Sequence, residues 1–306
     1  MRHFADRLIQ RTRRLGHPLC VGLDPHLERI PALFRQGSMA PRDPRTAAAV
    51  ESFLGAVLDR VSDRAAIVKP QIAFFERLGW PGLKALEAVV AKARGLSLPV
   101  LLDAKRGDVG STAAAYAEAY LGAEAALEAD AMTVNPYLGG DALAPFVERA
   151  EGHGRGLFVL VKTSNPGSGD FQDRTLEGGG TLFETVAESL AETALKLRGP
   201  ATGWSSLGVV VGATWPGESE RVRRRLPHSL FLVPGYGAQG GSAADAVRGL
   251  VPGPDGRLEG GVVSSSRGIL FPPLDADAGA RGWERAIDGA LDRAIDELAA
   301  VSPKPQ

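Results

Sequence analysis

The 306-residue sequence lacks several features that would assign it to a specialised class of proteins. It has a single cysteine, Cys20, which excludes an intramolecular disulfide and any metal site built from several cysteines. No apolar run approaches the roughly 20 residues of a membrane-spanning helix, so an integral membrane protein is not expected. The first fifteen residues are charged throughout and contain no apolar segment of a secretory signal. These absences predict a soluble, cytoplasmic protein.

The sequence also lacks an excess of either charge. It has 35 Lys and Arg against 36 Asp and Glu, which gives a formal net charge of −1. Binding to the phosphates of a nucleic acid needs a basic excess, so no nucleic-acid partner is expected. The five histidines show neither the H-E-x-x-H motif nor another spacing of metal ligands, so we expect no metal site.

Short apolar runs rich in β-branched residues recur along the chain, and each ends in polar residues, glycine or proline. Near-continuous apolar runs of this kind are typical of strands that are buried on both faces of a parallel sheet. The eight runs are Cys20–Leu23, Ala66–Val68, Pro99–Leu102, Ala131–Val134, Leu157–Val161, Leu207–Val211, Leu230–Val233 and Gly261–Val263.

Segments with helical periodicity lie between these runs. The clearest are Thr46–Val61, Ala113–Leu127 and Thr181–Leu197. Ser111 or Thr112 could cap the second of them, and Thr181 could cap the third. Strand and helix therefore alternate about eight times, with no linker that divides the chain. This alternation predicts an α/β protein with one (β/α)8 (TIM) barrel domain over residues 1–306 and short extensions at both ends, while an open doubly wound sheet is the alternative.

Polar residues follow the predicted strands. The carboxyl ends of all strands of a barrel open onto one face, where active sites are built. Residues gathered there would form one cleft. In chain order they are Asp24, Lys69, Asp103 with Lys105, Asn135, Thr163 with Ser164, Gly212, Pro234 with Gly235, and Ser266 with Arg267.

The segment around Asp103 is the strongest candidate for chemistry. Asp103 and Lys105 lie two residues apart on a strand, so both side chains should point into the barrel mouth. Lys69 closes another buried strand, and buried lysines need carboxylate partners, which Asp103 and Asp108 would supply. The alternatives are an exposed ion pair at a sheet edge and a lysine that extends to solvent at the barrel rim.

The loops after the last two strands are typical of a phosphate site. The first is rich in glycine and contains Pro234 and Gln239, and the second contains Arg267. Such loops often bind phosphate in barrels through backbone N–H groups, and an arginine adds a bidentate contact. Residues 235–240 also match the G-x-G-x-x-G pattern of dinucleotide sites, but they do not open a first βαβ unit.

Three other features carry less weight. Cys20 lies within an apolar run and is interpreted as a core residue rather than a nucleophile. His26 follows a strand end, where it could line the cleft or be solvated. The basic cluster Arg221–Arg225 is interpreted as the solvated face of a helix.

Together these motifs resemble the orotidine 5′-phosphate decarboxylase family, in particular its longer bacterial subgroup. The motif D-x-K-x-x-D-V-G-x-T runs from Asp103 to Thr112. Further matching segments begin at Val21, Val68, Val161, Pro234 and Ser265 and follow the family's order over residues of about 20 to 270. One position departs from the pattern, because asparagine is expected where Ser264 stands.

The resemblance implies a homodimer of barrels with shared active sites. It implies conversion of orotidine 5′-monophosphate to UMP and CO2, the last step of de novo UMP synthesis, without a cofactor or a metal. Lys105 would donate a proton to C6 of the pyrimidine, and Asp103 would face the departing carboxylate. Lys69 and Asp108 would complete an alternating array of charges, with Asp108 and Thr112 contributed to the partner's site.

The resemblance also implies which residues contact the substrate. Asp24 and Lys69 would bind ribose hydroxyls, and Ser164 would bind the pyrimidine. Gln239 and Arg267 would bind the phosphate, with Pro234 in the same part of the site.

Two other functions are compatible with the motifs. The D-x-K-x-x-D pattern also occurs in sister barrels that act on sugar phosphates, so a metal-dependent lyase or aldolase is one alternative. The other is a non-catalytic module that binds a phosphate ligand. Two lysines and two aspartates in one site argue against the binding module, because simple binding does not need two buried ion pairs.

Overall fold

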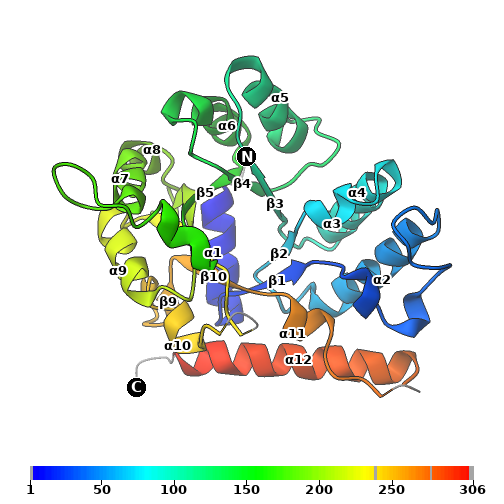
Figure 1. The fold of residues 1–306 in the computed structure, drawn as a ribbon. Helices are drawn as coiled ribbons and strands as arrows, with labels where there is room; N and C mark the ends of the chain where they lie inside the picture. The colour runs from blue at the N-terminus through cyan, green and yellow to red at the C-terminus, as the bar shows by residue number, and fades with distance from the viewer. Residues whose placement is uncertain (1–2, 238–239, 276–277, 303–306) are drawn as a thin grey trace.

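The computed structural model describes residues 3–237, 240–275 and 278–302, and its strands form a closed barrel (Figure 1). Eight parallel strands pair in the order β2-β1-β10-β7-β6-β5-β4-β3. Bridges from Val68 to Val100 and from Gln71 to Asp103 join β2 to β3 and close the ring. The strands are β1 (Leu19–Leu23), β2 (Ile67–Pro70), β3 (Leu101–Arg106), β4 (Ala131–Val134), β5 (Gly156–Lys162), β6 (Ser205–Val211), β7 (Ser229–Val233) and β10 (Gly261–Ser265).

Helices follow the strands and surround the barrel, as Figure 1 shows. A small antiparallel pair, β8 (Val251–Pro252) and β9 (Leu258–Glu259), precedes the last barrel strand. The helices are α1 (Phe4–Leu15), α2 (Thr46–Val61), α3 (Ala73–Glu76), α4 (Trp80–Gly95), α5 (Gly110–Leu121), α6 (Gly140–His153), α7 (Leu182–Ser189), α8 (Ala191–Lys196), α9 (Pro216–Arg225), α10 (Ala243–Ala246), α11 (Arg267–Leu270) and α12 (Ala280–Ala300), with 3-10 turns at Leu27–Arg29, Ala32–Phe34 and Pro166–Asp170. Among the described residues, no helix combines the length and the apolar character needed to cross a membrane.

The predicted barrel is confirmed, but four strands, β2, β3, β5 and β10, extend beyond the carboxyl ends of their apolar runs. β3 continues to Arg106, because its pairing with β4 resumes there after an irregularity that begins at Leu102. Asp103 and Lys105 therefore both lie within the strand, as predicted.

Two predicted helices differ from the observed ones. The predicted helix Thr181–Leu197 divides at Leu190, whose N–H bonds to Ala187 three residues back and so tightens the turn. The capping of this helix by Thr181 is confirmed, in a capping box with Glu184.

The other helix, predicted as Ala113–Leu127, is α5 and spans Gly110–Leu121. The prediction that Ser111 or Thr112 caps it is wrong. Val109 is the N-cap, and Gly110 with φ of +54° leads into the first turn, so both hydroxyl residues lie inside the helix.

The basic cluster Arg221–Arg225 is only partly solvated, which corrects its interpretation. The side chain of Arg223 is buried and donates hydrogen bonds to the backbone carbonyls of Gly249 (2.7 Å), Ser229 (2.7 Å) and Gly260 (2.9 Å). Arg223 therefore ties α9 to the loops around β7 and β10.

The amino-terminal end of the barrel is closed by α1, which lies across the middle of the ring in Figure 1. Phe4, Leu8 and Ile9 are buried in a cluster with barrel residues such as Leu101. The ring of Phe4 packs edge-on against Phe158, with the ring centroids 6.1 Å apart. Because this end of the barrel is filled with apolar side chains, polar chemistry is confined to the other end.

Candidate active site

A pocket of about 450 Å³ opens at the carboxyl ends of the barrel strands. It brings together seven of the predicted site residues, which come from six different strand ends: Asp24, Lys69, Asp103, Lys105, Ser164, Pro234 and Arg267. Convergence of this kind is what the barrel topology predicts.

Asp103 joins both predicted lysines in the pocket. One carboxylate oxygen lies 2.8 Å from the Nζ of Lys69, and the other lies 2.5 Å from the Nζ of Lys105. The side chains of Lys69 and Asp103 are 8% and 9% exposed, whereas that of Lys105 is 44% exposed. The array of Lys69, Asp103 and Lys105 is thus buried at Lys69 and open to the pocket at Lys105.

The charges of the array stabilise one another. Burial favours the neutral form of Asp103, but the ammonium groups of Lys69 and Lys105 outweigh it and hold the pKa of Asp103 well below its usual range. Burial likewise opposes the charge of Lys69, yet the carboxylates of Asp103 and Asp24 raise its pKa above the ordinary value. Both groups are therefore ionised at neutral pH.

The backbone at Lys105 is held in an unusual conformation. Its φ is +47°, in the left-handed region that a non-glycine residue adopts at a cost of about 1 kcal/mol or more. The hydroxyl oxygen of Thr133 on β4 accepts hydrogen bonds from the N–H groups of Ala104 (3.0 Å) and Lys105 (2.9 Å), and the hydroxyl donates to Asp103 (2.9 Å). Thr133 therefore fixes both the backbone and the carboxylate that orient Lys105. Thr133 could not be singled out from the sequence, because it lies within the apolar run Ala131–Val134.

Two buried polar atoms in the pocket have no partner among the described residues. They are the Oδ1 of Asp24 and the Oγ of Ser266, and both residues line the pocket. Buried polar groups are nearly always hydrogen-bonded, so two orphans in one pocket indicate a polar ligand. Glycine at position 22 leaves room for Ser266, since a Cβ there would lie 2.7 Å from the Cβ of Ser266.

Two predicted site residues, Asp108 and Thr112, do not line the pocket of this chain, and a third, Gln239, lies outside the described residues. Asp108 lies between β3 and α5, and Thr112 lies in the first turn of α5. In the part of the chain that the structure describes, the Asp108 carboxylate accepts a hydrogen bond from Val109 and pairs with no lysine or arginine. The expectation that Asp108 pairs with the two lysines is therefore wrong within one chain, where Asp103 bridges both.

Other candidates do not contribute to the pocket. His26 packs against the rings of Phe74 and Phe271. Cys20 is a core residue as predicted, and burial raises the pKa of its thiol to about 12. Within residues 3–237, 240–275 and 278–302, no three His, Cys, Asp or Glu side chains gather in a way that could hold a metal ion.

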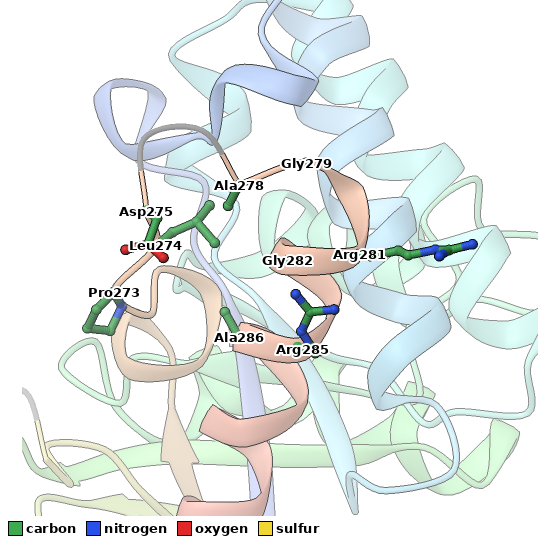
Figure 2. A pocket seen from close by; sticks show the side chains of 9 residues that line it. All are labelled: Pro273, Leu274, Asp275, Ala278, Gly279, Arg281, Gly282, Arg285 and Ala286. Atoms are coloured by element: carbon green, nitrogen blue, oxygen red, sulfur yellow. The ribbon is translucent and has the colours of Figure 1, made fainter.

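A larger hollow of about 740 Å³ lies beside the first turn of α12 (Figure 2). Its walls include Asp275, Arg281 and Arg285, and Arg281 points away from Asp275. Its described walls contain none of the predicted site residues and no ion pair between the residues that the structure describes. The pocket at the barrel mouth is therefore the candidate active site.

The sequence from residue 17 to 281 matches the orotidine 5′-phosphate decarboxylase / HUMPS family. The chain belongs to this family. A relative named orotidine 5′-phosphate decarboxylase from Rhodopirellula baltica is 43% identical and covers 97% of this chain and 99% of its own. Another with the same name from Deinococcus radiodurans is 43% identical over 95% of this chain and 98% of its own. The structure of Leishmania donovani OMP decarboxylase superposes with a TM-score of 0.72 at 33% identity and covers 98% of both chains.

This chain has a further buried charge beside the pocket, Lys162, which is not among the predicted site residues. Lys162 is the last residue of β5, directly before the pocket residues Thr163 and Ser164. The criterion that identified Lys69, a lysine that closes a buried strand, applies equally to Lys162 and could have found it.

Proposed function

We propose that this protein converts orotidine 5′-monophosphate to UMP and CO2 in the pocket at the barrel mouth. Its family and the names of its relatives support the reaction. The array of Lys69, Asp103 and Lys105 is the main support for catalysis in this pocket. A pocket that only binds a ligand does not need two cations bridged by a buried carboxylate. The relatives reported above give no support to a sugar-phosphate lyase.

The chemistry of the reaction explains why a fixed cation is required. When CO2 leaves, its bonding electron pair stays on C6 in the plane of the pyrimidine ring and cannot delocalise into the π system. The carbanion must therefore be stabilised electrostatically, by a cation placed in advance where the charge develops. Lys105 supplies this cation and then transfers a proton from Nζ to C6, which yields UMP.

The other members of the array orient Lys105. Asp103 holds its ammonium at 2.5 Å and would face the substrate carboxylate, while Lys69 balances the charge from the buried side. After the reaction Lys105 regains a proton from solvent, to which 44% of its side chain is exposed. One proton is consumed and one CO2 is released in each turnover, so the reaction needs no metal or cofactor as a further reactant.

The remaining pocket residues are assigned to the other parts of the substrate. Asp24 has an unpartnered carboxylate oxygen near Lys69, which suits ribose hydroxyls. Ser164 would bind the pyrimidine. Arg267, the first residue of α11 after β10, would bind the phosphate together with Gln239, and Pro234 follows β7 in the same part of the pocket.

We infer that two chains assemble so that Asp108 and Thr112 reach the partner's pocket. Large apolar side chains are exposed beside Asp108, namely Val109 (53%), Tyr137 (83%) and Leu138 (47%). The two loops are adjacent, because the N–H of Asn135 donates to the carbonyl of Arg106 at 2.8 Å. Exposed apolar side chains around an unpaired carboxylate suit an interface with a second copy of the chain.

The direct test is the ultraviolet spectrum of orotidine 5′-monophosphate incubated with the purified protein in EDTA. We expect it to change to the spectrum of UMP. An unchanged spectrum from folded protein would overturn the proposal, and turnover of a sugar phosphate with added Mg²⁺ would then favour the lyase.

A further inference from the structure

Lys162 is the most deeply buried charged side chain near the pocket. Its side chain has an exposed fraction of 0%. A buried ammonium costs several kcal/mol unless it is paired. The groups that pair with Lys162 therefore indicate what this lysine holds in place.

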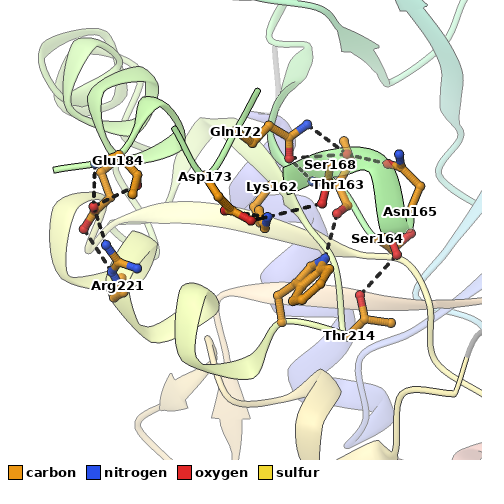
Figure 3. A network of polar contacts seen from close by, with 12 residues as sticks. Lys162, Thr163, Ser164, Asn165, Ser168, Gln172, Asp173, Glu184, Thr214 and Arg221 are labelled. Atoms are coloured by element: carbon orange, nitrogen blue, oxygen red, sulfur yellow. Dashed lines mark hydrogen bonds and ion pairs between the residues drawn. The ribbon is translucent and has the colours of Figure 1, made fainter. Parts of the chain in front are cut away.

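The partners of Lys162 come from the loop after β5 and from the start of α9. The Nζ of Lys162 donates to both carboxylate oxygens of Asp173, at 2.7 and 2.8 Å, and to the hydroxyl of Ser168 at 3.2 Å. It also lies 4.6 Å from the centre of the Trp215 ring, a cation–π contact. The ion pair thus fastens the loop of residues 163–173 back onto the end of β5 (Figure 3).

The fastened loop brings Gln172 against Thr163, the first residue after the strand. The side-chain oxygen of Gln172 accepts a hydrogen bond from the N–H of Thr163 at 2.9 Å, and its amide nitrogen donates to the Thr163 hydroxyl, also at 2.9 Å. On the other side, the indole N–H of Trp215 donates to the carbonyl of Thr163 at 2.9 Å. The hydroxyl of Thr214 donates to the carbonyl of Ser164 at 3.3 Å (Figure 3).

Ser164 is therefore held by its backbone while its side chain lines the pocket. Gly212 adds to this constraint, because a Cβ there would lie 2.7 Å from the Cα of Ser164. Across the described residues, the Ser164 hydroxyl has no hydrogen-bond partner of its own, so it is available to a ligand.

We propose that Lys162 and Asp173 are positioning residues that set the place of Ser164 for recognition of the pyrimidine base. This inference rests on the proposed function, in which Ser164 contacts the base. It predicts that loss of the ion pair weakens binding of the base selectively, without altering contacts with ribose or phosphate.

The test compares two inhibitors, UMP and ribose 5-phosphate, which differ by the base. Asp173→Asn removes the charge from a side chain that is 42% exposed, so the larger Asp173→Glu also fits. In Asp173→Asn we expect the Ki of UMP to rise about tenfold, the effect of roughly one lost hydrogen bond to the base, and the Ki of ribose 5-phosphate to stay within about twofold. Asp173→Glu should restore most of the affinity for UMP. Asp59→Asn breaks an exposed ion pair with Lys92 on the outer helices and serves as the matched control.

Gln172→Ala is a second variant, since it removes both hydrogen bonds to Thr163 without leaving a buried charge. It should reproduce the selective loss. Equal weakening of both inhibitors, or of neither, in Gln172→Ala and Asp173→Asn would overturn the positioning role. Ser164→Ala separates the two proposals. If the Ki of UMP does not change in Ser164→Ala, the assigned role of Ser164 is wrong. If the Ki of UMP rises in Ser164→Ala but not in Gln172→Ala or Asp173→Asn, only the inference about Lys162 and Asp173 is rejected.

Discussion

At the scale of single residues, the site depends on one carboxylate with two partners. Asp103 lies between a buried lysine and a half-exposed one, at 2.8 and 2.5 Å. Thr133 binds the same carboxylate and the backbone of Lys105. The position of the reactive ammonium therefore follows from Asp103 and Thr133 together, and removal of the charge on Asp103 should affect folding as well as catalysis.

Asp103→Asn should lower the free energy of unfolding by about 3–5 kcal/mol, because it leaves the buried Lys69 without its counterion. Turnover should fall in the same variant. Urea denaturation and the decarboxylation assay measure the two effects. Glu151→Gln, which breaks an exposed pair with Lys196, is the control and should leave the free energy of unfolding nearly unchanged. Wild-type stability in Asp103→Asn would contradict this account of the array.

His17 gives the protein a predictable response to acid. It is buried, and burial lowers its pKa from the ordinary 6.5 to about 4. Between these values the unfolded chain binds a proton that the folded chain does not, so the free energy of unfolding falls as the pH is lowered and is unaffected above pH 6.5.

Proton binding to His17 in the unfolded chain should lower the free energy of unfolding by about 3 kcal/mol once the pH is below 4. We expect wild-type protein to lose more stability than His17→Gln between pH 7 and pH 4 in urea denaturation, because carboxylate effects are common to both proteins. Parallel losses in the two proteins would show that His17 does not take part.

At the scale of elements, apolar runs predicted all eight barrel strands, because strands buried on both faces must be apolar. They could not predict where strands end when a charge is part of the strand. β3 includes Asp103 and Lys105, and β5 includes Lys162, because specific partners compensate each charge. Apart from the pair of Asp103 and Lys105, those partners are distant in sequence or lie in loops, so periodicity does not reveal them. The role of α1 was also not apparent, since charged residues separate its apolar ones.

The packing of α1 gives a test at this scale. Phe4→Ala removes a ring that is 1% exposed and packs against Phe158, so it should lower the free energy of unfolding by about 3–5 kcal/mol. The site lies at the opposite end of the barrel, so the KM for orotidine 5′-monophosphate should not change. Leu195→Ala, at a position that is 56% exposed, is the control. A stability loss no larger than that of the control would mean that α1 does not close the barrel.

At the scale of the whole molecule, the sequence predicted the barrel and most of the pocket. Asp24, Lys69, Asp103, Lys105, Ser164, Pro234 and Arg267 all line it. Asp108 and Thr112 could not be placed from the sequence, because the direction of a loop after a strand does not follow from periodicity. A single domain over residues 1–306 and a cytoplasmic location stay predictions.

A mixing experiment tests whether the sites are shared between two chains. Lys105→Ala and Asp108→Ala should each be inactive alone. If Asp108 acts in the partner's site, half of the randomly exchanged dimers regain one intact site, and activity should return to about a quarter of the wild-type value. If Asp108→Ala is inactive alone and the exchanged dimers stay inactive, Asp108 acts in the site of its own chain.

The role of Lys105 in stabilising and protonating the carbanion is tested most directly by the turnover of orotidine 5′-monophosphate by Lys105→Ala, measured beside the affinity of this variant for UMP. We expect kcat to fall at least about 10³-fold, which is typical of a removed electrostatic or acid–base group, while the Kd for UMP rises far less. Turnover near the wild-type rate in Lys105→Ala would show that Lys105 has neither role.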